Sequence, residues 1–178
     1  MNTTPTRPFY RWTIEILPVP TLLGSLAIFA ILFIILSSVL NFTVDMVLIG
    51  ALLGTVLHWS LEMIHHLGHA YLAQRTGYPM LGVRIGMLGI LAMSLYPKTE
   101  PKLPASVHIR RALGGPMASG ICAVIFLVLV LATAHLNDVL AWLFRLGLFE
   151  SLLMSVGALA PIPGIDGGTI LHYWRKRS

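Results

Sequence analysis

The stretch Leu57–Tyr71, L-H-W-S-L-E-M-I-H-H-L-G-H-A-Y, lies in a long apolar segment without proline and is expected to be helical. At about 100° per residue, its ionisable side chains fall within roughly 100° of one another on one helical face. These side chains are His58, Glu62, His65, His66 and His69. Because ionisable groups are costly inside a membrane helix, such a stripe indicates a functional site.

The composition is that of an integral membrane protein. The 178 residues are 56% hydrophobic and 11% charged, with a mean hydropathy of +0.82, whereas soluble domains carry about 25% charged residues. The net charge of +5 comes from basic residues scattered over short loops and both ends of the chain, so a nucleic-acid partner is not expected. The single cysteine, Cys122, cannot form an internal disulfide.

We expect an all-α membrane bundle of about four transmembrane helices, embedded in a lipid bilayer. Residues 1–19 are predicted to be a tail, and residues 20–178 a single transmembrane domain. The expected spans are about 21–40, 46–74, 112–134 and 139–160, which have the length and apolarity that a bilayer requires. Residues 78–108 mix charges and prolines with short apolar pieces, which predicts a small hairpin insertion. Prolines and glycines break the backbone at 161–168.

The basic residues predict the orientation of the bundle. All but one of the 12 Lys and Arg residues fall in the tail, in the region 75–111 or at the C-terminus, and with four spans these regions share one side. The positive-inside rule makes that side the cytosol. We therefore expect a protein of a bacterial cytoplasmic membrane with a cytosolic hairpin insertion and both termini in the cytosol.

Two distant segments carry residues suited to one metal ion. His65 and His69 are four residues apart, the spacing at which two imidazoles on one helix reach the same ion. Asp166 is the one acidic residue in the broken segment P-I-P-G-I-D-G-G at 161–168. Irregular backbone is tolerated at membrane depth only where it is buried in protein or lines a cavity. Two histidines and one carboxylate would bind Zn²⁺ and leave a fourth position open.

These motifs resemble those of the site-2 proteases, the M50-type intramembrane zinc metalloproteases. The segment H-H-L-G-H-A at 65–70 is similar to that family's H-E-x-G-H-A, and 161–168 is similar to its N/P-x-P-x-x-D-G-G element. A third segment, A-L-G-G-P-M-A-S-G at 112–120, resembles its A-G-P-x-A-N element, and the three occur in the family's order. The resemblance implies a site-2-protease-like domain with His65, His69 and Asp166 as zinc ligands.

The chain departs from the family pattern at two positions. The family's general-base glutamate is His66 here, and the polar residue of the third motif is Ser119 instead of asparagine. A base that moves a proton contributes roughly 10²–10⁴ in rate. We therefore expect a non-catalytic or impaired homologue that binds a membrane-embedded helix of a partner protein.

Two alternatives stay open at this point. The first is an active intramembrane zinc metalloprotease that uses His66, or Glu62 one turn earlier on the same stripe, as its catalytic base. The second is an accessory subunit of a larger membrane complex in which histidines ligate haem or a pigment.

Overall fold

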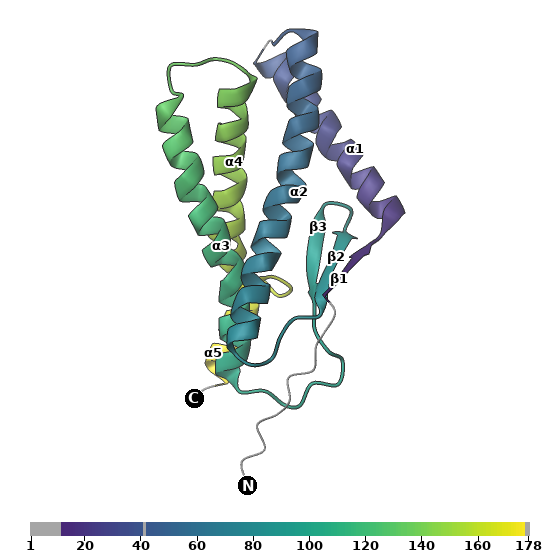
Figure 1. The fold of residues 1–178 in the computed structure, drawn as a ribbon, viewed down its shortest axis with the longest axis vertical. Helices are drawn as coiled ribbons and strands as arrows, with labels where there is room; N and C mark the ends of the chain where they lie inside the picture. Colours follow the sequence, from purple (N-terminus) through teal and green to yellow (C-terminus); the bar gives the residue numbers. More distant parts are fainter. Residues whose placement is uncertain (1–11, 41, 177–178) are drawn as a thin grey trace.

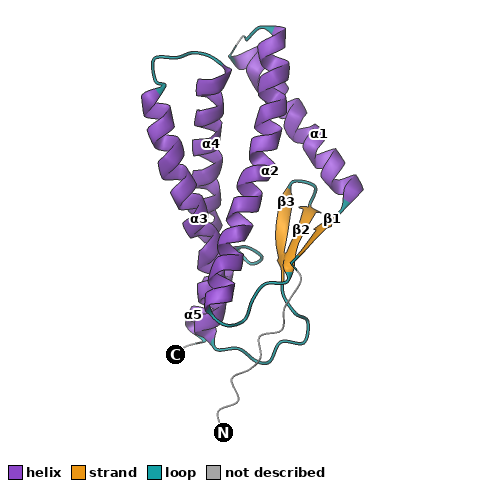
Figure 2. Cartoon of the chain, in the orientation of Figure 1, coloured by secondary structure: helices purple, strands orange, loops and turns teal. Residues whose placement is uncertain are grey.

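The computed structural model describes residues 12–40 and 42–176 of the chain. Helices dominate it, and a small sheet lies beside them (Figures 1 and 2). The elements in chain order are β1 (Thr13–Ile16), α1 (Pro18–Ile34), the π-helical turn η1 (Ile35–Val39), α2 (Val44–Arg75), β2 (Gly82–Met87), β3 (Leu91–Leu95), α3 (Ala105–Ala132), α4 (Val139–Ser155), the 3₁₀ turn η2 (Gly157–Leu159) and α5 (Asp166–Arg175).

Four helical segments of the described residues are long and apolar enough to cross a membrane, which confirms the predicted membrane bundle. They are Pro18–Val39, Val44–Arg75, Ala105–Ala132 and Val139–Leu159. The third begins before the predicted residue 112, because the helix continues through a polar turn in which the Arg111 side chain is buried. Large apolar side chains cover the outside of the bundle, as expected for surfaces that face lipid.

A three-stranded sheet in the order β1-β2-β3 lies between α1 and α2 (Figure 1). β2 and β3 form an antiparallel hairpin inside the predicted 78–108 insertion. β1 pairs with β2 in parallel, with Thr13 opposite Gly82. The described part of the expected 1–19 tail is thus ordered, because pairing with β2 satisfies the backbone of β1. Residues 1–11 lie outside the described part.

The tip of the hairpin packs directly against α1. Leu88 and Gly89 at the turn have φ of 50° and 84°, and residues with positive φ build the tight turns that join antiparallel strands. A Cβ atom on Gly24 of α1 would overlap the carbonyl group of Gly89. The two backbones approach closely only because position 24 has no side chain.

An apolar cluster packs α1, η1, α2 and α4 together at the end of the bundle away from the sheet. It consists of Leu32, Leu36, Val47, Ala51 and Trp142. The ionisable stripe occupies the remaining length of α2, between the hairpin on one side and α3, α4 and α5 on the other. The fold therefore places that stripe inside the protein and away from lipid.

Candidate metal centre

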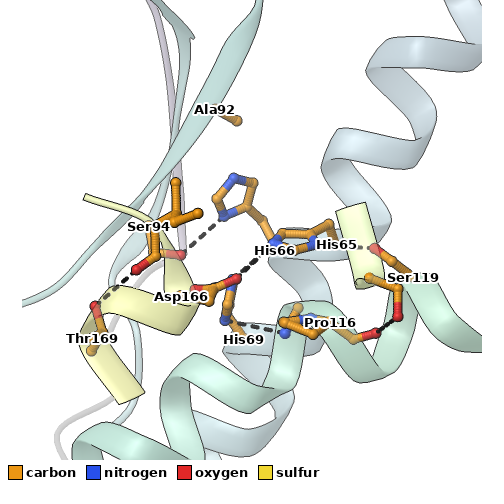
Figure 3. A network of polar contacts seen from close by, with 12 residues as sticks. His65, His66, His69, Ala92, Ser94, Pro116, Ser119, Asp166 and Thr169 are labelled. Carbon is orange, nitrogen blue, oxygen red and sulfur yellow. Dashed lines mark hydrogen bonds and ion pairs between the residues drawn. The ribbon is translucent and has the colours of Figure 1, made fainter. Parts of the chain in front are cut away.

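His65, His69 and Asp166 converge in the interior of the bundle, as the sequence predicts (Figure 3). The histidines project from α2, and Asp166 is the first residue of α5. Each offers one ligand atom, and these atoms all lie within 4.8 Å of one another. No other group of three or more His, Cys, Asp or Glu side chains in 12–40 and 42–176 meets this criterion.

The three side chains lie close enough together for one zinc ion to contact all of them. His65 Nε2 lies 3.1 Å from His69 Nε2 and 3.3 Å from Asp166 Oδ2, and His69 Nε2 lies 3.4 Å from Asp166 Oδ1. Ligands held about 2.0–2.1 Å from a tetrahedral ion are separated from one another by about 3.3 Å. The two Nε2 atoms lie close to this separation, and each lies 3.3–3.4 Å from one of the two carboxylate oxygens of Asp166.

Hydrogen bonds from α3 orient both imidazole rings. His65 Nδ1 lies 2.9 Å from Ser119 Oγ, and His69 Nδ1 lies 2.8 Å from the backbone carbonyl oxygen of Arg111. The backbone N–H of Gly115 also lies 3.2 Å from His69 Nδ1, so α3 places both a backbone acceptor and a backbone donor at this nitrogen. Partners of this kind fix the tautomer and direction of metal-binding histidines.

Glycines in the third motif make room for the site. A Cβ atom on Gly115 would lie 2.6 Å from His65 Cε1 and nearer still to the Nε2 atoms of His65 and His69. Gly114 and Gly68 allow α3 to cross α2 closely, since a Cβ on either glycine would overlap the backbone of the other. The motif therefore clears the metal position as well as allowing the helices to pack.

The broken segment delivers Asp166 from the opposite side. The chain leaves the spanning segment at η2 and turns through Pro161 and Pro163, and α5 begins at Asp166. Burial raises the pKa of Asp166, but its hydrogen bonds with His65 and His69 outweigh burial and lower the pKa to about 2. Asp166 is consequently a carboxylate, the form that binds a metal ion, throughout the physiological pH range.

His66 and Glu62 face the hairpin. His66 Nδ1 lies 3.0 Å from Ser94 Oγ, and His66 Nε2 lies 3.7 Å from Glu62 Oε2. The same Glu62 oxygen accepts a hydrogen bond of 3.0 Å from the backbone N–H of Ala92. His66 therefore stands outside the group of three ligands, with its two ring nitrogens directed to other partners.

Sequence reasoning missed the part that the insertion plays beside the site. Ser94 in β3 contacts His66, although nothing in the local sequence distinguishes it from other serines. Arg111 is buried, forms an ion pair with Glu100 and donates to the carbonyl of Tyr78. Two features of the sequence could have indicated the contacts of Arg111. They are a basic residue at the start of the third span and an acidic residue in the proline-rich insertion before it.

One solved structure supports this description of the fold. No protein-family model and no curated protein matches the chain. The structure of the site-2 protease from Methanocaldococcus jannaschii superposes with a TM-score of 0.58 over 93% of this chain and 68% of that chain, at 24% sequence identity. The chain is therefore an integral membrane protein with a site-2-protease-like fold.

Proposed function

We propose that this chain is a site-2-protease-like membrane protein that holds a divalent metal ion, zinc, between His65, His69 and Asp166. The observation that carries the proposal is the convergence of their ligand atoms, which all lie within 4.8 Å of one another, with the two Nε2 atoms 3.1 Å apart. Buried imidazoles and a carboxylate are also the donor set that zinc takes in catalytic sites with an open fourth position.

In this proposal the protein residues hold and shield the ion. His65, His69 and Asp166 bind it, Ser119 and the Arg111 carbonyl orient the two rings, and Gly115 leaves the space open. Zinc in such a site supplies Lewis acidity, which polarises carbonyl groups and acidifies water. The burial of the site keeps bulk water away from this chemistry.

We further propose that the protein is a non-catalytic or impaired homologue that binds a partner's membrane-embedded helix. The residue after His65 is a histidine, and its two ring nitrogens lie 3.0 Å from Ser94 Oγ and 3.7 Å from Glu62 Oε2. Glu62, the other candidate base, accepts a hydrogen bond from the hairpin backbone. Position 66 therefore offers no carboxylate, and the Glu62 carboxylate is already hydrogen-bonded to the hairpin. Both observations disfavour a general base beside the three candidate ligands. The basic loops and both termini are proposed to face the cytosol.

Elemental analysis of the purified full-length protein tests the metal site. We expect close to one zinc per chain in the wild type and none in His65→Ala, His69→Ala or Asp166→Ala. His135→Ala is the matched control, since His135 follows α3, outside the candidate centre, and should leave the zinc content unchanged. Wild-type protein without metal after zinc reconstitution would refute the site, and a coloured preparation containing haem or pigment would support the accessory-subunit alternative.

A cleavage assay tests the loss of catalysis. The wild type and His66→Glu are incubated with a panel of single-span helical substrates in detergent and in liposomes. We expect no cleavage by the wild type and metal-dependent cleavage by His66→Glu. Zinc-dependent cleavage by the wild type that His66→Ala abolishes would instead establish an active protease with a histidine base.

A further inference from the structure

The ionisable stripe of α2 makes three successive contacts with the β2–β3 hairpin, one with the residue before β3 and two with β3 itself. His58 Nε2 lies 2.8 Å from the carbonyl oxygen of Ile90, and Glu62 Oε2 accepts from the N–H of Ala92 at 3.0 Å. His66 Nδ1 lies 3.0 Å from Ser94 Oγ. Figure 3 shows the third contact, with Ala92 farther along the strand from the metal ligands.

The spacing of these contacts follows from the geometry of a helix and a strand lying side by side. Four residues of an α-helix advance by about 6.0 Å, and two residues of an antiparallel strand advance by about 6.8 Å. Side chains at every fourth position of α2 therefore meet every second residue from Ile90 to Ser94. The two advances differ by only about 0.8 Å per step.

Strand β3 needs such partners because it is an edge of the sheet. In the order β1-β2-β3 found among the described residues, β3 is an outer strand, and it packs against α2. Edge strands present backbone N–H and C=O groups that are costly to leave without hydrogen bonds away from water. Glu62 supplies an acceptor to this edge, and His58 donates to the carbonyl of Ile90, the residue before β3. Both side chains are largely buried.

His58 connects the same edge to a second helix. Its Nδ1 lies 3.5 Å from Glu150 Oε2 on α4, while its Nε2 donates to Ile90. The hairpin tip is thus held from α1 through Gly24 and from α2 through His58 and Glu62. Of these, Glu62 contacts a residue of β3 itself.

We propose that Glu62 is a positioning residue that docks the β2–β3 hairpin on α2 through its hydrogen bond with Ala92. His58 adds a second contact, at Ile90 near the hairpin turn. This role brings Ser94 to His66 and sets the hairpin beside the metal centre. It needs an acceptor oxygen at position 62 and no proton transfer. It also goes beyond the proposed function, because it does not depend on a bound metal.

Hydrogen–deuterium exchange of the full-length protein in detergent, with and without added zinc, tests the proposal. Glu62→Leu removes the acceptor, and Glu62→Gln keeps an acceptor oxygen of similar reach. We expect exchange of the peptide covering residues 88–95 to rise about ten-fold or more in Glu62→Leu and to stay within about two-fold of the wild type in Glu62→Gln. Ser60→Ala is the matched control, because its exposed hydroxyl bonds only to Val56 of its own helix.

A variant on the strand side keeps the test decisive if Glu62→Leu folds poorly. Ala92→Pro removes the N–H that Glu62 binds, and proline is tolerated on edge strands. We expect it to open the hairpin as Glu62→Leu does, and the double variant to be no worse than either single one. Unchanged exchange in both single variants, or equal opening in Glu62→Gln and Glu62→Leu, would overturn the proposal whether or not zinc binds.

Discussion

Replacing Gly115 by alanine should abolish metal binding without unfolding the protein. The added Cβ would lie 2.6 Å from His65 Cε1. Real Cβ atoms essentially never come within 3.0 Å of a heavy atom of a residue that is not their neighbour in the chain. The His65 ring must therefore move by at least about 0.4 Å, and both Nε2 atoms by more. Metal–ligand distances tolerate only about 0.2 Å, so the converging geometry is lost.

Gly120→Ala is the matched control for this substitution. It lies on the same helix, and its Cβ would meet only Ser155 Oγ, at 3.2 Å. Both substitutions gain the same helix propensity, about 0.5–1 kcal/mol in favour of the helix. A difference in zinc affinity between the two variants is therefore caused by the lost space at the candidate metal position and not by helix propensity.

The assay is a zinc titration against a chromophoric chelator, combined with thermal melting followed by circular dichroism. We expect the zinc affinity of Gly115→Ala to fall at least about 100-fold, beyond the loss seen when a hydrogen-bonding partner of a ligand is removed. Gly120→Ala should bind as the wild type does. Wild-type affinity in Gly115→Ala would refute the site as described, since no ion could then lie where the side chains converge.

Two further predictions concern the residues around the site. Ser119→Ala removes the partner of His65 Nδ1 and should weaken zinc binding by about 10–100-fold, with an unchanged melting profile; full affinity would show that the ring needs no such support. Glu100→Gln leaves the buried Arg111 without its counter-charge and should cost about 3 kcal/mol of unfolding free energy. Glu15→Gln, in an exposed ion pair, should cost less than about 1 kcal/mol, as chemical denaturation in detergent would measure; equal losses would contradict the assigned difference.

The residues that local sequence could reveal are those whose geometry is set within one helix or one turn. His65 and His69 face the same way because α2 is helical, and Asp166 was distinguished by the proline and glycine residues around it. The four spans follow from hydropathy, which acts over each helix separately. These features needed no knowledge of how the chain folds back on itself.

The remaining features depend on contacts between distant segments. β1 forms only because Thr13 meets Gly82, and α3 extends to Ala105 because Arg111 finds Glu100 and Tyr78. Helical periodicity placed Glu62 on the polar face, but which atom it binds depends on the register of β3. No local pattern encodes that register, so the base role and the docking role could not be separated from sequence.

The arrangement of the stripe explains how a histidine can occupy position 66 without enlarging the ligand set. Adjacent helical residues point about 100° apart, so the side chains of His65 and His66 leave α2 in different directions. Its nitrogens contact Ser94 and Glu62, whereas the Nε2 atoms of His65 and His69 face Asp166. The candidate metal position and the hairpin contacts therefore use different side chains of the same polar face. A substitution at position 66 should consequently change chemistry at the site while zinc content stays constant, and a substitution at Glu62 should change the hairpin while zinc content stays constant.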